Sequence, residues 1–306
     1  MRNYIHKKGR GKQQTVYIFS CLKISLQIWG KNYYLYGLTL PPNFIPIVIY
    51  DRERPSFEDS NNVTVQRCFF AYEFAESYIT GKTAADVGCA NGYGTVHLAK
   101  FATQITGLDY STITVENNKK EYADKPNMSF IQCKVPPIAL PDESVDVVTA
   151  FQFIEHIQDQ LGFIKDVKRV LRPGGVFICT TPNASMSIAR NPFHVHEYTF
   201  AEMKGHMEQV FGSNYELMGL NGNAVVNKYY EDNSRWAKRI LRLDPLGLHK
   251  LIPASWLIKP YNYLTSKMRK NLKESNSDTL NISTKDFILQ KENLDVCWDI
   301  FAVARK

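Results

Sequence analysis

The fold is decided by the stretch Ala84-Ala-Asp-Val-Gly-Cys-Ala-Asn-Gly-Tyr-Gly-Thr-Val-His-Leu-Ala-Lys100. Its first residues suit a short buried strand, and Val96 and Leu98 begin the apolar face of a helix after the turn. The exposed amides at the start of such a helix favour a polar or anionic ligand group. A ligand can also approach the backbone closely, because it lacks side chains at Gly88, Gly92 and Gly94.

A second strand, Ile105-Thr-Gly-Leu-Asp109, ends in a carboxylate about 20 residues after the first glycine. At this position a nucleotide-binding α/β unit places the acid that binds the ribose hydroxyls. The glycine order here is G-x-x-x-G-x-G, whereas the dinucleotide fingerprint is G-x-G-x-x-G. This difference disfavours a nicotinamide dehydrogenase, which we keep as a rival interpretation to be separated by titration with the two cofactors.

The run from Asp86 to Gly94 resembles the glycine-rich loop of class I S-adenosylmethionine-dependent methyltransferases, with Ala90 where the middle glycine is usual. The alternative is a structural turn in another α/β protein. Further motifs resemble the same family in the expected order, so that the resemblance covers about 52–220 and 285–306. They are Leu140–Thr149, Phe151–His156, Arg169–Gly175, Thr180–Asn183, Asn191–Thr199 and the closing stretch 293–306.

The resemblance implies S-adenosylmethionine as the cofactor. It implies that Asp86 and the Gly88–Gly92 backbone hold the methionine moiety and that Asp109 binds the ribose diol. It also implies that Tyr110 packs on the adenine and that Phe151 lines the methyl-facing side. The candidate cofactor-binding residues are therefore Asp86, Gly88, Cys89, Ala90, Gly92, Asp109, Tyr110, Cys133, Lys134 and Phe151.

One departure concerns the adenine. After the third strand the family usually has Gly-Asp, whose carboxylate contacts the adenine amine, whereas this sequence has Gln132-Cys133-Lys134. A lysine cannot accept that hydrogen bond. Either the backbone at Cys133 and Lys134 holds the adenine alone, or the affinity for the cofactor is reduced.

Three histidines are the candidate catalytic residues. A hydroxyl acceptor benefits from a general base, and histidine suits neutral pH. His156 follows the fourth strand at the carboxyl edge of the sheet, where ligands bind. His194 and His196 follow the fifth strand and can reach the same cleft, as base or as substrate contacts. Their spacing beside Glu197 could suggest a metal, but no third ligand stands at a defined spacing, and we expect no metal.

Strands and helices alternate through the core. This spacing predicts β-α-β units and an α/β, Rossmann-like sheet of seven strands, mostly parallel, with helices on both faces. Two segments that both read as strands, 215–220 and 296–305, are expected to form a closing antiparallel hairpin. The other strands are expected at about 83–88, 105–109, 128–133, 145–151 and 175–181, and helices at 93–102, 111–123, 159–171 and 199–211.

Local signals fix several helix ends. Ser111 and Asp159 are expected as N-caps, and Thr199 with Glu202 three residues later forms a capping box. Arg172-Pro-Gly-Gly175 ends the preceding helix, because proline cannot continue it. An amphipathic helix at Gln66–Tyr78 precedes the first strand and, in methyltransferases of this type, partly covers the cofactor.

The charge is concentrated in residues 1–50. Of the 37 lysines and arginines, seven lie there with no acidic residue, which leaves 30 basic and 30 acidic residues in the remainder. A globally basic nucleic-acid binder is therefore not indicated. We expect 1–50 to be a basic N-terminal extension, either disordered or the product of a start codon placed too far upstream, and 51–306 to be the methyltransferase domain.

A long insertion at about 222–294 separates the last two predicted strands. It is expected to be helical and mixes Trp, Leu and Ile with Lys and Arg over 235–273. One interpretation is a helical lid packed on the catalytic domain. The other is peripheral contact with an anionic membrane surface, which would suit a lipid-linked glycan acceptor.

The stretch Asn191–Thr199 and the closing residues resemble a subset of the family that includes bacterial cell-surface glycan and small-metabolite methyltransferases. This resemblance implies methyl transfer to an oxygen of a glycan, sugar or small metabolite, and no nucleic-acid partner is expected. The competing interpretation is a catalytically inactive methyltransferase fold that serves as a binding platform, for which Ala90 and Lys134 are the evidence. The six cysteines lie far apart with no C-x-x-C, which indicates a reduced protein, cytoplasmic or peripheral to a membrane. No signal in the sequence indicates the oligomeric state.

Overall fold

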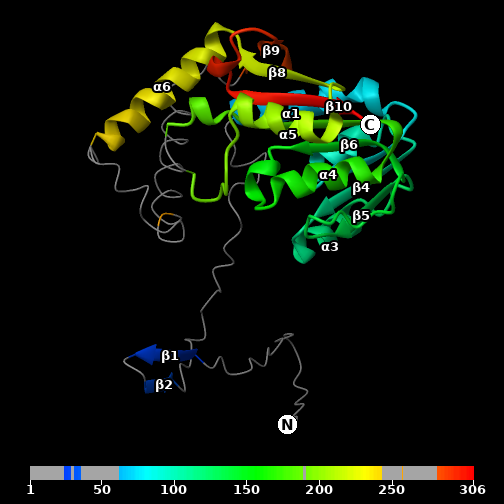
Figure 1. The fold of residues 1–306 in the computed structure, drawn as a ribbon, viewed down its shortest axis with the longest axis horizontal. Coiled ribbons are helices and arrows are strands. Elements are labelled where there is room, and N and C mark those ends of the chain that lie inside the picture. Colours follow the sequence, from blue (N-terminus) through cyan, green and yellow to red (C-terminus); the bar gives the residue numbers. More distant parts are fainter. Residues whose placement is uncertain (1–23, 29–30, 36–61, 189–190, 243–256, 258–280) are drawn as a thin grey trace, which may run out of the picture. The chain divides into compact units, whose positions relative to one another are not determined.

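The computed structural model describes residues 24–28, 31–35, 62–188, 191–242, 257 and 281–306, in two compact units, 1–50 and 51–306 (Figure 1). In the first unit, β1 (Ile24–Ile28) and β2 (Lys31–Leu35) form an antiparallel pair. The rest of the N-terminal extension lies outside the described residues.

The second unit is built on an eight-stranded sheet with the order β5-β4-β3-β6-β7-β10-β8-β9. Strands β3 to β7 run parallel to their neighbours within this group, and β8, β9 and β10 pair antiparallel. The strands are β3 (Thr83–Val87), β4 (Gln104–Asp109), β5 (Met128–Gln132), β6 (Val145–Phe151), β7 (Leu171–Pro182), β8 (Tyr215–Gly222), β9 (Phe287–Gln290) and β10 (Asp299–Arg305).

The predicted mostly parallel sheet with a closing antiparallel hairpin is confirmed. Strand β10 lies between β7 and β8, so that Phe301 is opposite both Thr180 and Met218. Within the described residues the sheet has eight strands, one more than the seven predicted. Strand β9 lies at the edge within the expected helical insertion, and its four residues are too few to show a period of two.

Helices cover both faces of the sheet (Figure 1). Alternate residues of β7 face opposite ways: Ile178 packs with the helices of one face, and Phe177 with those of the other. The first face carries α1 (Asn62–Ile79) and α2 (Tyr93–Leu98), and the second carries α4 (Gln160–Val170) and α5 (Phe200–Phe211). Helix α3 (Thr112–Glu121) packs on β4 and β5.

The predicted helix caps are present. Ser111 accepts a hydrogen bond from the Thr114 amide, and Asp159 accepts one from the Gly162 amide. Thr199 and Glu202 form the reciprocal capping box at the start of α5. These local bonds set where each helix begins, and therefore where the preceding loops leave the carboxyl edge of the sheet.

Helix α6 (Ala224–Leu241) begins the insertion and packs against β8 through the buried Val226 and Tyr229. Trp298 donates a hydrogen bond from Nε1 to Asn227 Oδ1 and stacks on the Tyr230 ring. The start of the insertion therefore packs on the domain at β8. Most of the basic segment 235–273 lies outside the described residues, which omit 243–256 and 258–280.

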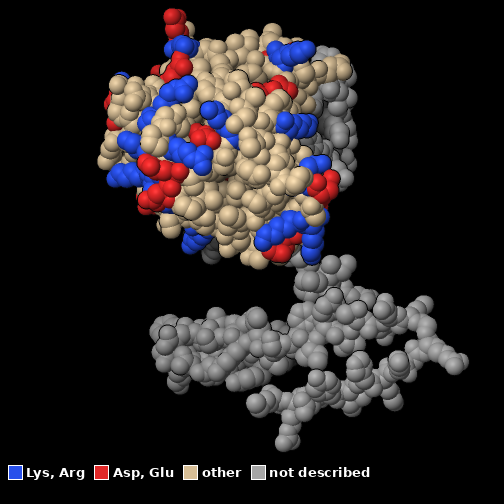
Figure 2. Space-filling view, turned by 90° about the vertical axis from the view of Figure 1, so that its right-hand side faces the viewer, with Lys and Arg blue, Asp and Glu red and all other residues tan. Residues whose placement is uncertain are grey.

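Among the described residues, no helix combines the length and the apolar character that crossing a membrane requires. On the face of the second unit drawn in Figure 2, lysines and arginines are interspersed with aspartates and glutamates. The described residues of that face thus form no area of a single charge sign.

Candidate functional site

The glycine-rich loop joins β3 to α2 in a left-handed conformation. Gly88, Ala90 and Gly92 have φ angles of 77°, 47° and 77°. The alanine therefore stands where a glycine would adopt the same backbone without steric cost. Its peptide groups are held on both sides, because Ala90 N donates to Asp109 Oδ2 at 3.1 Å and Ala90 O accepts from Asn118 Nδ2 at 2.8 Å.

Aromatic rings pack directly on the glycines of this loop. A methyl group added at Gly88 would lie 2.3 Å from the Phe153 ring, and one added at Gly94 would lie 1.9 Å from the Tyr72 ring. Tyr72 belongs to α1 and also meets Phe151 edge-on at 4.8 Å. Helix α1 therefore packs over the glycine loop through Tyr72.

Asp86 lies at the end of β3 and is almost fully buried, with 1% of its surface exposed. Its Oδ2 accepts a hydrogen bond from Thr95 Oγ1 at 2.6 Å, and its Oδ1 accepts one from Thr149 Oγ1 at 2.8 Å. Burial raises the pKa of this carboxyl to about 6, although the two hydroxyl donors act in the opposite direction. The folded protein thus buries the Asp86 carboxyl beneath the glycine loop, where ionising it costs free energy.

Asp109 ends the neighbouring strand β4. Its Oδ1 accepts from the Ser111 amide at 2.9 Å and its Oδ2 accepts from the Ala90 amide. A carboxylate has about four acceptor sites, so these bonds are compatible with a further pair from a ribose diol. Tyr110 follows with an exposed ring, 58% accessible, beside this carboxylate in the chain.

The two cysteines among the candidate residues turn their thiols into the protein. Cys89 is buried with Val115 and Phe130, and its amide donates to Leu108 O. Cys133 Sγ accepts from the Ala139 amide at 3.2 Å, which ties down the turn after β5. Burial raises the pKa of the Cys133 thiol. Because both thiols are buried, these two residues can contact a ligand only through their backbone. The neighbouring Lys134 is exposed.

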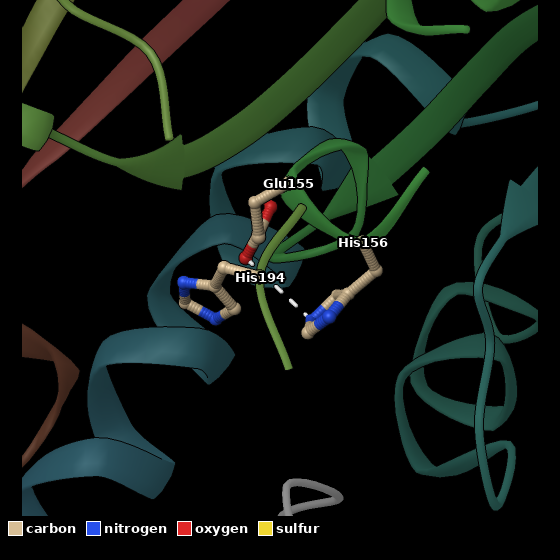
Figure 3. Close-up of side chains that lie close together, drawn as sticks. All are labelled: Glu155, His156 and His194. Carbon is tan, nitrogen blue, oxygen red and sulfur yellow. Dashed lines mark ion pairs between the residues drawn. The ribbon is translucent and has the colours of Figure 1, made fainter. Parts of the chain in front are cut away.

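A second group of side chains follows strands β6 and β7 at the same edge of the sheet. The short helix η1 (Ile154–His156) carries Glu155 and His156, and the loop before α5 brings His194 beside them (Figure 3). The two imidazole rings meet edge-on at 4.9 Å, and His156 Nε2 lies 3.9 Å from Glu155 Oε1. Residues far apart in the sequence thus form one compact cluster.

Each member of this cluster is held by the surrounding backbone and side chains. His156 Nδ1 lies 3.2 Å from Phe193 O, and His194 Nδ1 lies 2.5 Å from Glu197 Oε1. Burial alone would raise the pKa of Glu197, but hydrogen bonds from His194 and Ser187 lower it overall. Glu197 is therefore ionised at neutral pH and orients the His194 ring.

Glu155 is the buried member, with 1% of its surface exposed. Its Oε2 accepts from Thr181 Oγ1 at 3.0 Å, whereas its buried Oε1 accepts no hydrogen bond from any described residue. Burial raises its pKa, and the charges of His156 and His194 oppose that change. In the sequence, Glu155 stands out only as part of the motif Phe151–His156, and it is not among the predicted site residues.

His196 is not part of the cluster. Its side chain is 49% exposed, and its Nε2 lies 3.4 Å from Glu202 Oε1 on α5. The two side chains have different neighbours although they are only two residues apart: His194 contacts Glu197, and His196 contacts Glu202. The sequence predicts that both histidines reach one cleft; in the structure the His194 ring lies against His156, while His196 faces α5.

A further polar group lies around the start of β10. Arg67 Nε on α1 is 3.4 Å from Asp299 Oδ2, and the Arg67 guanidinium lies over the Tyr230 ring of α6. Burial raises the pKa of Asp299, with Arg67 opposing it. Among the described residues, the buried polar atoms without a hydrogen-bond partner are Arg67 Nε, Asp299 Oδ1, Tyr230 OH and Glu155 Oε1. No local signal in the sequence indicates that Arg67, Asp299 and Tyr230 meet.

Comparison with known proteins finds similarity to methyltransferases. A family model described as "Methyltransferase domain" matches residues 85–179. A protein of Mycolicibacterium smegmatis with the name "Probable S-adenosylmethionine-dependent methyltransferase" is 36% identical over 171 residues, which is 53% of this chain and 65% of that protein. A "Ubiquinone biosynthesis O-methyltransferase" of Methylobacterium sp. is 30% identical over 110 residues, covering 35% of this chain and 44% of the relative.

The chain thus spans less than two thirds of the length of these curated relatives. Among solved structures, the YcgJ protein of Bacillus subtilis is similar with a TM-score of 0.49 and 15% identity, over 78% of this chain and 98% of that one. The matched segment 85–179 begins in β3 and ends in β7, and therefore contains the glycine loop, Asp109 and the Glu155–His156 pair. The chain contains a class I S-adenosylmethionine-dependent methyltransferase domain, and S-adenosylmethionine is the cofactor that this family implies.

Proposed function

We propose that the protein transfers the methyl group of S-adenosylmethionine to an oxygen atom of a sugar, a glycan or a small metabolite. The observation that carries this proposal is the common position of two groups. The glycine loop and Asp109 follow β3 and β4, and the Glu155–His156–His194 cluster follows β6 and β7. These four strands are parallel, so both groups lie at the carboxyl edge of one sheet, where ligands of such folds bind.

In this proposal the first group holds the cofactor. The loop backbone over Gly88–Gly92 and the buried Asp86 receive the methionine part, whose ammonium group suits a carboxylate. Asp109 receives the ribose diol, and the exposed Tyr110 ring packs on the adenine. Phe151 then lies on the side of the methyl group. The backbone at Cys133 and Lys134 supplies the remaining adenine contacts.

The second group receives the acceptor. The methyl carbon passes from the sulfonium sulfur to the acceptor oxygen, which leaves S-adenosylhomocysteine, and the hydroxyl proton must be taken up or its pKa lowered. The contact between His156 Nδ1 and Phe193 O turns Nε2 toward the cluster. We therefore assign the activation of the acceptor oxygen to His156 and its neighbours, with His194 beside it.

An oxygen acceptor with several polar groups is supported by the residues beyond the cluster. Arg67, Asp299 and Tyr230 present buried polar atoms without hydrogen-bond partners among the described residues. A sugar hydroxyl can satisfy both donors and acceptors of this kind. The Methylobacterium relative that is named an O-methyltransferase is consistent with transfer to oxygen.

The first test is the binding of S-adenosylmethionine to the full chain by isothermal titration calorimetry. Asp109→Ala is expected to weaken binding by at least about tenfold, because it removes a charge-assisted acceptor. Asp109→Asn keeps an acceptor for one amide and guards against misfolding. Asp124→Ala is the matched control, since Asp124 is exposed and its ion pair among the described residues is with its neighbour Lys125.

The second test is turnover. Release of S-adenosylhomocysteine is measured with monosaccharides, lipid-linked glycans and hydroxylated quinols as acceptors. The alternative proposal, an inactive binding platform, is motivated by Ala90 and Lys134. A folded wild-type chain that binds neither S-adenosylmethionine nor its product would favour that alternative and refute the enzyme proposal.

A further inference from the structure

We propose that Glu155, His156 and His194 bind a divalent transition-metal cation. One potential ligand atom from each residue lies within 4.8 Å of the other two (Figure 3). Binding of the cation stands on this geometry alone, whereas its use in catalysis rests on the function proposed above. The expectation of no metal came from the pair His194 and His196, and the structure brings a different trio together.

The donor set is supported first by the buried carboxylate. Glu155 is almost fully buried, Thr181 holds its Oε2, and its Oε1 accepts no hydrogen bond from any described residue. A buried carboxylate oxygen without a donor is costly unless a positive charge compensates it. A cation beside Oε1 would supply that charge, and the nearby His156 Nε2 at 3.9 Å marks the direction in which it would lie.

The second support is the orientation of the two imidazoles. Metal-binding histidines usually give their other ring nitrogen to a carbonyl or a carboxylate, which fixes the tautomer. Here Nδ1 of His156 lies beside the carbonyl of Phe193, and Nδ1 of His194 lies beside the carboxylate of Glu197. Both arrangements assign the proton to Nδ1 and the lone pair to Nε2.

The third support is the rigidity of the loop that carries His194. The amides of Val195 and His196 both donate to Glu155 O, and Gln160 Nε2 donates to Ile154 O and to His196 O. The loop is thus fastened to η1 at several points, so the three side chains are positioned before any ligand arrives. Pre-positioned ligands lose less conformational entropy when a cation binds.

One contact competes with the cation. Asn191 Nδ2 lies 2.9 Å from His194 Nε2, so this amide occupies the nitrogen that we assign to the metal. Its Oδ1 accepts from the Phe193 amide. The cation must therefore displace the amide, which limits the affinity, and removal of the amide is expected to tighten binding.

The chemistry of the donors selects the class of cation. Two imidazoles and one carboxylate suit zinc, iron or manganese, whereas magnesium and calcium prefer sites made of oxygen ligands. Three protein ligands leave coordination positions open. A hydroxyl of the acceptor can occupy one of them, and the cation then lowers its pKa so that the proton leaves to water. In that state Nε2 of His156 is a ligand, and it does not itself take the proton.

The test uses the full chain with any affinity tag removed. Zinc binding is measured by calorimetry, and cobalt binding by the visible absorption that a site of four or five ligands gives. Glu155→Gln keeps the acceptor for Thr181, and His194→Ala removes one imidazole. Each is expected to weaken binding by about 100-fold, because loss of a ligand costs at least as much as loss of its supporting partner.

His196→Ala is the matched control, because that imidazole is nearby but faces Glu202. It is expected to leave the zinc affinity within about twofold, whereas Asn191→Ala is expected to raise it. Circular dichroism of each variant checks the fold. An affinity that falls equally in His196→Ala, or a folded wild type that gives no cobalt spectrum, would overturn the inference.

S-adenosylmethionine binding is measured on the same samples, so that the two proposals fail separately. Cofactor binding without cation binding would remove this inference and leave the proposed function. Cation binding without cofactor binding would leave this inference and remove the proposed function.

Discussion

Replacing Asp86 by asparagine is expected to stabilise the cofactor-free protein and to weaken its binding of S-adenosylmethionine. Asp86 is buried, and its oxygens accept hydrogen bonds from Thr95 and Thr149. An asparagine has the same shape and keeps one acceptor, but it carries no charge. The substitution thus separates the cost of the buried charge from its use in binding.

The magnitude follows from the pKa of the carboxyl, which burial raises from 3.8 to about 6. Between these values the folded protein binds more protons than the unfolded one, so stability falls as the pH rises through this window and stays lower above it. The full cost at pH 8 is about 3 kcal/mol. Subtracting about 1 kcal/mol for one lost acceptor leaves a gain of about 2 kcal/mol in the variant.

At pH 5 only about half of that cost is present, so the gain should shrink to about 0.5 kcal/mol. The assay is chemical denaturation of wild type and Asp86→Asn at both pH values, without cofactor. Calorimetry at pH 8 is expected to show cofactor binding weakened by about tenfold or more, since a charge-assisted contact is lost. A variant less stable than wild type at pH 8, or with unchanged cofactor affinity, would refute the reasoning.

Three further substitutions test the loop and its surroundings. Ala90→Gly removes the cost of holding an alanine in a left-handed conformation. The unfolding free energy is expected to stay the same or to rise by up to about 1 kcal/mol, with cofactor affinity retained. A loss of more than about 1 kcal/mol would contradict the inference that Ala90 is strained. Gly94→Ala drives a methyl group into the Tyr72 ring and is expected to cost about 1–3 kcal/mol in denaturant, whereas the control Gly205→Ala, in an open position of α5, should gain up to about 1 kcal/mol. If the adenine amine lies beside residue 134, Lys134→Asp is expected to bind the cofactor about three- to tenfold more tightly than Lys134→Ala. The affinities are measured by calorimetry, and equal affinities would place the adenine elsewhere.

The order of strands and helices could be predicted because its signals are local. Ser111, Asp159 and the Thr199–Glu202 pair each satisfy amides within three residues, so the sequence contains both partners. The central parallel strands β3 and β6 also have enough buried residues to stand out as apolar runs. Strand β9 has neither signal, because its stability comes from pairing with β8 across the insertion.

The cofactor side of the candidate site could be predicted further than the acceptor side. Asp86 and Asp109 end strands, and the topology alone brings strand ends together. The contacts that tune them, such as Thr149 to Asp86, depend on side-chain direction across neighbouring strands. Arg67 and Asp299 are far apart in the sequence of the domain but lie side by side in the fold. The periodicity of residues describes single helices and strands, so it cannot predict such a contact.

His194 and His196 show the same limit at shorter range. The sequence treats them alike, but one ring meets Glu197 and His156 and the other meets Glu202. The burial of Glu155, which makes it part of the cluster, follows from packing under the loop and not from its own chemistry.

The place of β10 between β7 and β8 has a consequence for biosynthesis. Asp299–Arg305 follow every other strand in the sequence, yet they fill the gap between two strands that leave the ribosome much earlier. Until they emerge, β7 and β8 each present an unpaired edge, which is the kind of surface that recruits foreign strands. A nascent chain stalled before Asp299 should therefore depend on chaperones, and the sheet should close in a single late step.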